Sequence, residues 1–153
     1  MSLKFTKPII SDQLDILEPF LLIDSIKIDI ANQKAIAKRA IDHNDWFFSC
    51  HLPKTQVMPA TLIIEGMLQT MAMLIYKSID HKFNRAYIVD IRSKLLASIT
   101  PKDKEIIYTA TLISSKRGIT KGYVDAKYKD EKKSEGNFIY ASPHLMNIPS
   151  NTI

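Results

Sequence analysis

The sequence has little cysteine, little glycine and no long uninterrupted apolar run. Its 153 residues include one cysteine and four glycines. A single cysteine excludes an intrachain disulfide and a cysteine-rich metal site, and it fits a reducing compartment. The N-terminal segment lacks the apolar core of a signal peptide, and polar residues interrupt the longest apolar run, residues 57–76. We therefore expect a cytoplasmic protein without a membrane span.

Repeats, low-complexity tracts and charged tails are also missing, and the length suits one domain over residues 1–153. The net charge of +5 comes from scattered lysines, densest at residues 102–104 and 127–133. In these runs lysines alternate with acids, which indicates solvated turns. A basic surface favours an acidic partner by long-range steering. No basic stripe is interleaved with aromatic residues, so no nucleic-acid partner is expected.

Hydrophobic periodicity predicts one long helix between two groups of strands. Alternation at residues 20–30 and 34–41 predicts a hairpin, whereas the segment that follows, up to residue 56, is expected to be irregular. A helix over about residues 59–77 is rich in Leu, Met, Ala and Ile, with Pro59 in its first turn. Four strand-like runs then follow with short spacers, and they predict an antiparallel meander: residues 85–99, 105–115, 118–128 and 135–142.

The apolar character of the helix decides the fold class. A helix that is apolar on nearly every side must be wrapped by other structure. One curved antiparallel sheet of about five or six strands meets this need. The pattern therefore predicts an α+β protein with the hotdog fold, a long central helix inside a curved sheet. Residues 142–153 lack periodicity and are expected to form a C-terminal tail.

Glu65 is the only carboxylate in the middle of the helix. Thr61, Glu65 and Gln69 are spaced four apart and therefore share one stripe. Apolar surroundings disfavour the charged form and raise the pKa of a carboxyl group unless a partner compensates. Two interpretations stay open. Glu65 is either a proton donor at neutral pH, or a carboxylate that faces solvent or is satisfied by Gln69 and a basic side chain.

His51 lies just before the helix, and a lone loop histidine is more often structural than catalytic. The helix start at Met58, Pro59 and Ala60 favours a chemical role instead, because the first N–H groups of a helix have no partners within it. Together with the positive end of the helix dipole they could hold a carbonyl oxygen that becomes negative. A base, an acid and an oxyanion site suit enolate chemistry next to a thioester.

The other candidate residues carry weaker signals. His43, His81 and His144 have no liganding neighbours in the sequence and are expected on the surface, not at a metal site. Cys50 is expected to be a packed thiol. The methionines of the helix suit the core, although they would also line an acyl tunnel: Met67, Met71 and Met73.

Residues 47–69, FFSCHLPKTQVMPATLIIEGMLQ, resemble the signature of 3-hydroxyacyl-[acyl-carrier-protein] dehydratases of the FabZ type. In that family F-F-x-G-H-F-P is followed by P-V-M-P-G and then by an E-A-M-x-Q helix. PFLLID at residues 19–24 and PKD at residues 101–103 resemble the family's P-F-L-L-V-D and P-G-D. The resemblance covers about residues 14–141 in the same order of elements.

The resemblance implies roles for individual residues. His51 takes the place of the catalytic histidine, Glu65 that of the catalytic carboxylate, and Ala60 that of the glycine whose amide binds the thioester carbonyl. Pro59, Met58 and Gln69 complete the expected substrate-binding set. Glutamate at position 65 favours the FabZ type over the FabA type, which has aspartate there and also isomerises the double bond.

The resemblance also implies partners. The substrate is expected on the phosphopantetheine arm of an acyl carrier protein. A homodimer is expected whose sites each take their two catalytic residues from different subunits, with a trimer of dimers as a further assembly. Neither a metal nor an organic cofactor is expected.

Several positions depart from the family pattern. Cys50 and Ala60 replace glycines, Leu52 replaces a phenylalanine, and Lys54-Thr55-Gln56 replaces Gly-His-Pro. Ile16-Leu17 stands where the family has His-Arg. These departures indicate a specialised pathway rather than housekeeping fatty acid synthesis.

The sequence thus predicts a lyase that converts a 3-hydroxyacyl thioester into its trans-2-enoyl form. His51 would take the α proton, the Ala60 amide would stabilise the enolate oxygen, and Glu65 would protonate the leaving hydroxyl. One alternative is a hotdog thioesterase that uses the carboxylate to activate water. Another is a non-catalytic hotdog subunit that binds acyl chains or supports an active partner, as the altered glycines suggest.

Overall fold

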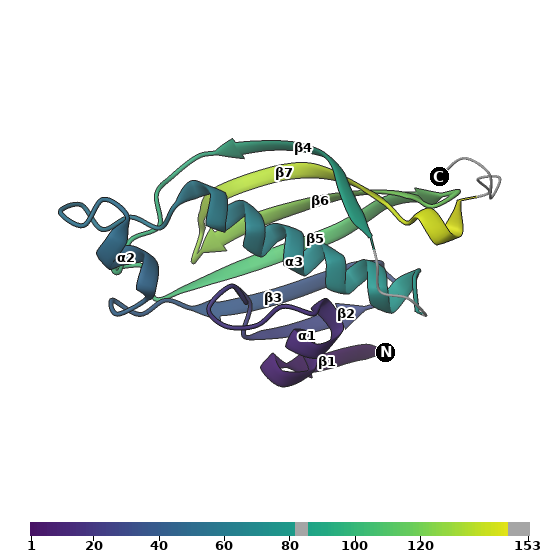
Figure 1. The fold of residues 1–153 in the computed structure, drawn as a ribbon, viewed down its shortest axis with the longest axis horizontal. Coiled ribbons are helices and arrows are strands. Elements are labelled where there is room, and N and C mark those ends of the chain that lie inside the picture. The colour runs from purple at the N-terminus through teal and green to yellow at the C-terminus, as the bar shows by residue number, and fades with distance from the viewer. Residues whose placement is uncertain (82–85, 147–153) are drawn as a thin grey trace.

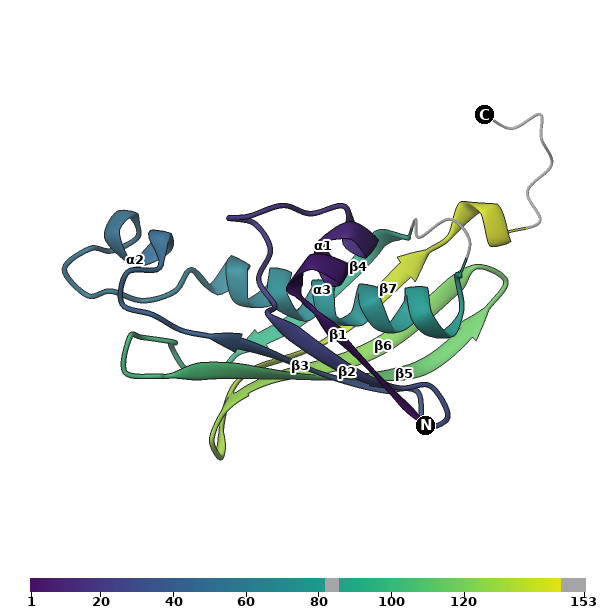
Figure 2. The same ribbon diagram turned by 90° about the horizontal axis from the view of Figure 1, so that it is seen from below.

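The protein folds as one seven-stranded sheet that curves around a long helix (Figure 1). The structure is a computed structural model, and it describes residues 1–81 and 86–146. All neighbouring strands are antiparallel, in the order β1-β2-β3-β5-β6-β7-β4. The helix α3 (Ala60–Ser78) lies across one face of the sheet, with the short helix α1 (Lys7–Leu14) on the same side (Figure 2). This arrangement confirms the predicted hotdog fold.

The strands lengthen from the first edge of the sheet toward its middle, and their bounds are β1 (Ser2–Thr6), β2 (Ser25–Asp29), β3 (Lys34–Ala40), β4 (Tyr87–Leu95), β5 (Glu105–Lys116), β6 (Ile119–Tyr128) and β7 (Glu131–Ala141). In β3 and β5 buried and more exposed residues alternate along the strand. One face of the sheet therefore belongs to the core.

The core lies between the sheet and α3. Met67, Met71 and Met73 are fully buried, which assigns the helix methionines to the core. The Tyr140 hydroxyl donates a hydrogen bond to the Leu68 carbonyl at 2.8 Å and ties the helix to β7. The helix also lies close to β5, and Gly66 makes this possible. A Cβ at position 66 would lie 2.3 Å from the Tyr108 hydroxyl oxygen.

Seven strands exceed the predicted five or six because β1 was not expected. β1 is short, and its pairing with β2 sets Phe5 opposite Ile26, so the pairing partner makes this segment a strand. The α1 helix was also not predicted. The segment before residue 56, expected to be irregular, contains the short helix α2 (Trp46–Cys50).

The predicted meander of four strands is correct for β5, β6 and β7 and wrong for β4. β4 precedes β5 in the chain but pairs with β7, at the far edge of the sheet. After β4 the chain must pass β7 and β6 to reach β5. The short segment between β4 and β5 therefore does not mean that these two strands are neighbours in the sheet. Arg85, where the first of these strands was expected to start, lies outside the described residues.

The remaining boundaries lie close to expectation. The predicted helix over residues 59–77 is observed at Ala60–Ser78. β7 begins at Glu131, inside a stretch predicted to be a solvated turn. Of the expected C-terminal tail, Pro143–Leu145 form a 3-10 turn, and residues 147–153 lie outside the described residues. No helix in the described part of the chain is long and apolar enough to cross a membrane.

Candidate active site

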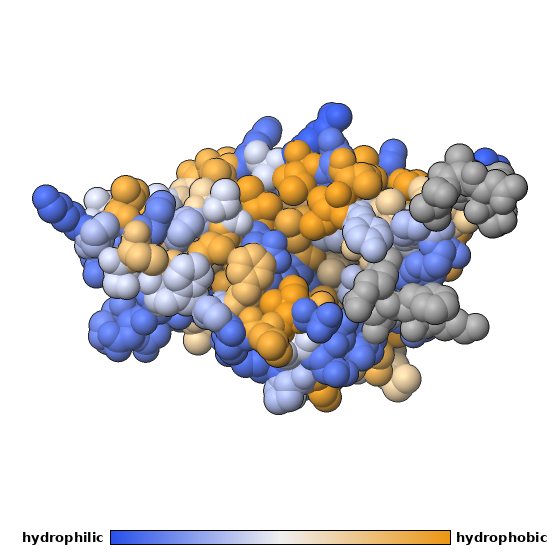
Figure 3. Space-filling model, viewed as in Figure 1, coloured by the Kyte–Doolittle hydropathy of each residue, from blue (hydrophilic) through white to orange (hydrophobic). Residues whose placement is uncertain are grey.

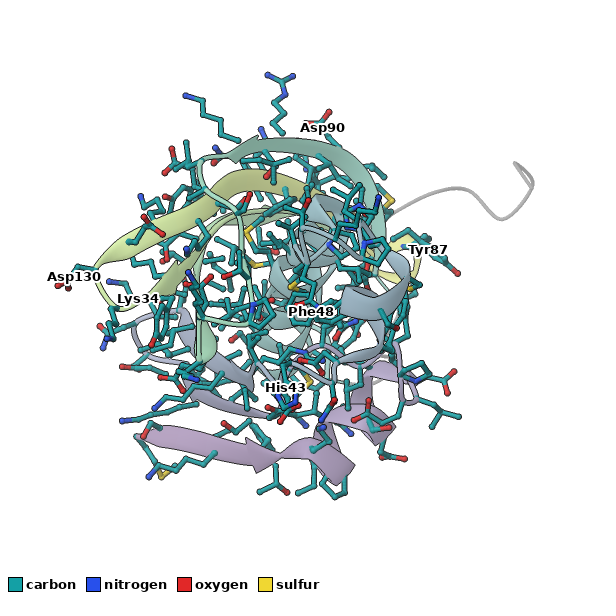
Figure 4. All side chains as sticks on the ribbon, turned by 90° about the vertical axis from the view of Figure 1, so that its left-hand side faces the viewer. Lys34, His43, Phe48, Tyr87, Asp90 and Asp130 are labelled. Carbon is teal, nitrogen blue, oxygen red and sulfur yellow. The ribbon has the colours of Figure 1, made fainter. Side chains whose placement is uncertain are left out.

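His51 sits at the C-terminal end of α2, which is anchored to the core. Its backbone N–H donates to the Phe47 carbonyl at 3.0 Å, and Phe47 and Phe48 are fully buried. Figure 4 shows Phe48 near the centre of the molecule when it is viewed from the α2 end. These contacts place His51 on a fixed element instead of a free loop.

An ion pair holds the other end of α2. Asp45 is the N-cap residue, and both of its carboxylate oxygens accept hydrogen bonds from the Arg39 guanidinium, at 3.1 and 3.2 Å. Arg39 is 8% exposed, and it lies over the Phe47 ring. Two parallel N–H···O bonds fix direction as well as distance. The pair therefore sets the orientation of α2 and, through it, of His51.

The hydrogen bond of the His51 ring determines which nitrogen can act as a base. Nδ1 lies 3.0 Å from the Val57 carbonyl oxygen. A carbonyl oxygen only accepts hydrogen bonds, so Nδ1 carries the hydrogen and Nε2 of the neutral imidazole keeps its lone pair. The side chain is half-buried. Nε2 is therefore the atom that can take a proton.

The start of α3 offers a free amide. Pro59 is the N-cap and not the first helical residue, and its carbonyl accepts from Leu62 and Ile63 at 3.0 and 3.3 Å. The Met58 N–H donates to the Ile99 carbonyl at 2.8 Å. Among the described residues, no acceptor takes the N–H of Ala60. This amide, at the positive end of a long helix, is placed to bind an oxygen that gains negative charge.

A cavity of about 380 Å³ joins these groups. One side, which we name the helix wall, consists of His51, Val57, Met58, Ala60 and Ile63. The other side, which we name the strand wall, consists of Leu95, Leu96, Ala97 and Ser98 at the end of β4. The cavity thus brings together the predicted residues His51, Met58 and Ala60, with Pro59 between the last two in the chain.

Glu65 lies outside this cavity. The side chain is half-buried, and burial raises its pKa although a hydrogen bond from Gln69 Nε2, at 3.0 Å, lowers it. No cation pairs with Glu65 within residues 1–81 and 86–146. The interpretation of Glu65 as a satisfied carboxylate required both Gln69 and a basic side chain as partners. The structure shows the Gln69 partner and, among the described residues, no basic one. A raised pKa favours the protonated carboxyl, which can donate a proton.

Gln69 is buried and fastens α3 to the segment before β2. Its Nε2 also donates to the Phe20 carbonyl at 2.8 Å, and its Oε1 accepts from the Leu22 N–H at 2.8 Å. The amide thus fixes the carboxyl of Glu65 and the PFLLID segment together. Gln69 does not line the cavity, so its position is that of a residue that orients Glu65.

Helix geometry explains the separation of Glu65 from His51. Residues two apart on a helix point to opposite sides, and Glu65 is two residues after Ile63 of the helix wall. Within one chain the base and the carboxyl group therefore face different spaces.

The remaining candidates lie on the surface. Cys50 is exposed, so the expectation of a packed thiol was wrong: the last turn of α2 points outward, and the Sγ atom lies 3.3 Å from the Trp46 carbonyl. His43, His81 and His144 are exposed, and His144 Nε2 lies 2.8 Å from a carboxylate oxygen of Asp80. The described residues contain no group of three or more His, Cys, Asp or Glu that could hold a metal.

Two charged residues that the sequence placed in solvated turns are buried. Lys133 is 5% exposed and Asp103 is 8% exposed, and they form an ion pair at 3.1 Å. The Lys133 ammonium also donates to the Ser98 carbonyl of the strand wall, 35 residues away in the chain. Local charge patterns cannot reveal such a partner. The one hint was Asp103 in the PKD segment of the family resemblance.

Comparison with known proteins shows the family of the chain. The family model for FabA-like domains matches residues 16–137. A FabZ 3-hydroxyacyl-[acyl-carrier-protein] dehydratase from Clostridium kluyveri is 31% identical over 124 residues, covering 80% of this chain and 85% of that protein. The FabZ protein of Enterococcus faecalis is 29% identical over 123 residues, covering 79% and 87%. The chain belongs to the FabA-like family, as a divergent FabZ-type member.

Solved structures confirm the fold of this FabZ-type chain. The dehydratase heterocomplex ApeI:P from Xenorhabdus doucetiae superposes with a TM-score of 0.67 at 12% identity, covering 88% of this chain and 90% of that one. A phenylacetic acid degradation-related protein from Ralstonia eutropha gives 0.65 at 8% identity, covering 90% and 92%. At such identities the likeness concerns the fold, so the reaction must be argued from the site.

Proposed function

We propose that this FabZ-type protein removes water from a 3-hydroxyacyl thioester carried by an acyl carrier protein and yields the trans-2-enoyl thioester. One observation carries the proposal: His51, whose Nε2 is the basic nitrogen, and the unpaired Ala60 amide line the same cavity. The curated relatives, which share most of their length with this chain, are named as dehydratases of such substrates.

The reaction follows from these groups. The thioester oxygen accepts a hydrogen bond from the Ala60 N–H, which stabilises the negative charge that develops on it. His51 Nε2 takes the proton from C2, and the electron pair forms the C2–C3 double bond as the C3–O bond breaks. The Glu65 carboxyl donates its proton to the departing hydroxyl, which leaves as water. Transfer of a proton from His51 to Glu65 then restores the starting state.

The open cavity and the position of Glu65 support a homodimer with shared sites. β4 is an edge strand, and its large apolar side chains are exposed: Tyr87, Ile88, Val89, Ile91 and Leu95. Figure 3 shows apolar side chains gathered on the side of the molecule where β4 lies, and Figure 4 shows Tyr87 and Asp90 at its rim. Exposed apolar edge strands mark sites of strand pairing.

Pairing of two copies along β4 would cover this patch. Because β4 leads directly into the strand wall, a second copy there also stands over the cavity. In the first copy Glu65 lies on another face of α3, away from the cavity. The Glu65 of the second copy then takes its place at this site. Each site of the dimer has His51 and Ala60 from one subunit and Glu65 from the other.

The proposal is tested with the purified protein alone and a 3-hydroxyacyl-acyl carrier protein. Formation of the enoyl thioester and release of free thiol are measured in the same reaction. We expect enoyl product without thiol release. Thiol release without enoyl product would indicate the thioesterase, and no conversion of either kind would indicate a non-catalytic subunit. His51→Ala is the control that ties any product to the cavity.

A further inference from the structure

Lys133 is a buried cation, and one of its contacts is the Ser98 carbonyl of the strand wall. Its ammonium binds the Ser98 carbonyl at 3.0 Å and the Asp103 carboxylate at 3.1 Å, and it also contacts the carboxylate of Glu131. Burial lowers the pKa of Lys133, but the two carboxylates outweigh it and the pKa is raised overall. The side chain therefore remains an ammonium at neutral pH and satisfies three oxygen atoms at once.

The main chain of Lys133 holds the same wall. Pairing of β4 with β7 ends at Leu95 opposite Ser134. Beyond that point the Lys133 carbonyl accepts from the N–H groups of Leu96 and Ala97, at 2.9 and 3.1 Å. With the ammonium on Ser98, one residue thus holds three consecutive residues of the strand wall after it has left the sheet.

Asp103 extends this anchoring to the turn that follows the strand wall. Its second carboxylate oxygen accepts from the Thr100 N–H at 2.8 Å, while its own N–H donates to the Thr100 carbonyl at 2.9 Å. Between them, the Ile99 carbonyl accepts from Met58 of the helix wall. The strand wall is therefore fixed on one side by Lys133 and Asp103 and on the other by the start of α3.

We infer that Lys133 is a positioning residue that sets which acyl chains the cavity accepts, by fixing the strand wall opposite His51 and Ala60. It does not touch the reacting atoms. Loss of the ammonium leaves the Ser98 carbonyl and the Asp103 carboxylate without their partner, and the strand wall moves as they seek water. The inference rests on the proposed function for the identity of the ligand, an acyl thioester.

Lys133→Met tests the inference, because it keeps the unbranched chain and removes the charge. kcat and KM are measured for 3-hydroxyacyl thioesters of increasing chain length, beside thermal unfolding. We expect the ratio of kcat/KM between short and long chains to change by about tenfold or more, since one methylene in an apolar pocket is already worth about that much. The change should lie mainly in KM. An unchanged ratio would overturn the inference.

Two controls separate position from general stability. Glu131→Gln removes an exposed carboxylate from the same ammonium and touches no wall residue. Lys132→Met removes the neighbouring lysine, which binds Glu135 and the Tyr123 hydroxyl instead. Both controls should leave the chain-length ratio unchanged. A similar change in either control would show that the charge run as a whole, and not Lys133, is responsible.

A double variant covers the case in which Lys133→Met folds poorly. Lys133→Met with Asp103→Asn removes both charges of the buried pair, a change that proteins often tolerate, and keeps a side-chain oxygen that can accept from the Thr100 N–H. Stability should recover while the chain-length ratio stays altered, because the Ser98 carbonyl still lacks its donor. Recovery of the ratio together with stability would reduce Lys133 to a structural role.

The inference can fail separately from the proposed function. Binding of thioether analogues of increasing chain length, measured by calorimetry, reports on the cavity without any reaction. A parent protein that binds the analogues but dehydrates nothing would end the proposed function. The inference would then be decided by comparing the affinities of the parent and the Lys133→Met variant for short and long analogues. A Lys133→Met variant whose affinities for short and long analogues keep the parent's ratio would end the inference alone.

Discussion

The two walls of the cavity are built in different ways. The helix wall lies within residues 51–63, and apart from the bond of Met58 to Ile99 it is held by short-range bonds: His51 to Phe47 and Val57, and Leu62 and Ile63 to Pro59. The strand wall depends on partners far along the chain, since Lys133 binds Ser98 across 35 residues. The basic nitrogen and the free amide belong to the first wall. The second offers apolar side chains and carbonyl groups.

Because of this difference, we assign the reaction to the helix wall and the choice of ligand to the strand wall. A group that takes part in the reaction needs an orientation fixed within a fraction of an ångström, and short local connections provide it. A wall that only limits the shape of the ligand can vary through distant contacts without loss of the reaction. Changes in the helix wall should therefore lower kcat, whereas changes around the strand wall should alter KM and chain-length preference.

His51→Ala is expected to give the largest effect on the helix wall. Loss of the base should lower kcat by about a thousandfold, near the middle of the range for general base catalysis. The fold should persist, because the side chain is half-buried and lies at the end of α2. Steady-state kinetics and thermal unfolding measure both quantities, with the exposed His43→Ala as the matched control. Near-normal turnover would remove His51 from the mechanism.

Ala60→Val should give the next largest effect. Two added carbons crowd the amide that binds the thioester oxygen, and loss of such a donor costs about 3 kcal/mol of transition-state stabilisation. Ala60→Gly should leave the enzyme active or faster, at a helix-propensity cost below about 1 kcal/mol at a helix end. The comparison uses kcat on one acyl-carrier substrate. A valine variant as active as the parent means that the thioester does not dock at this helix end.

Glu65→Gln should lower turnover by about a hundredfold, because glutamine keeps the shape and cannot donate the proton. Burial raises the pKa of Glu65, so the parent keeps its proton to higher pH than an ordinary glutamate. Activity should fall as pH rises through this pKa, and the variant should lose that limb of the pH profile. Any stability that the neutral carboxyl provides is also lost on the same rise in pH.

A stability measurement completes this prediction. Glutamine stays neutral at every pH, so the Glu65→Gln protein should be no less stable than the parent at neutral pH. Equal losses of stability and activity would instead identify Glu65 as a structural carboxylate.

Asp45→Asn should give the smallest effect on the reaction. The change weakens the pair with Arg39, and it should cost about 2 kcal/mol of unfolding free energy, as expected for hydrogen bonds to charged groups. kcat should fall only a few-fold as α2 loosens and His51 loses its orientation. Urea unfolding is compared with that of Asp42→Asn, an exposed residue of the same loop. Equal midpoints for the two variants would show that the Arg39 pair does not anchor α2.

The sequence predicted the parts of the molecule that local patterns determine. The central helix and the strands β5 to β7 could be predicted, as could the position of His51, Met58 and Ala60 near the start of that helix, because these features lie within one segment or between neighbours in the chain. The position of β4 beside β7 and the strand β1 could not, since they depend on pairing across the sheet.

Lys133 and Asp103 show the same limit at the level of side chains. Each lies in a run of alternating charges that reads as a solvated turn, and only the fold brings the two together in the interior. Gln69 was recognised from the helix pattern. Its bonds to the backbone of Phe20 and Leu22 could not be derived from that pattern.

Mixed dimers test the central claim, that His51 and Glu65 of one site belong to different subunits. The inactive variants His51→Ala and Glu65→Gln are co-expressed with different tags, and the dimers are assayed together. Random pairing makes about half of the dimers mixed, each with one intact site of two, so turnover should recover to about a quarter of the parent's. Turnover no higher than that of either variant alone, in a sample that contains mixed dimers, would contradict the shared site.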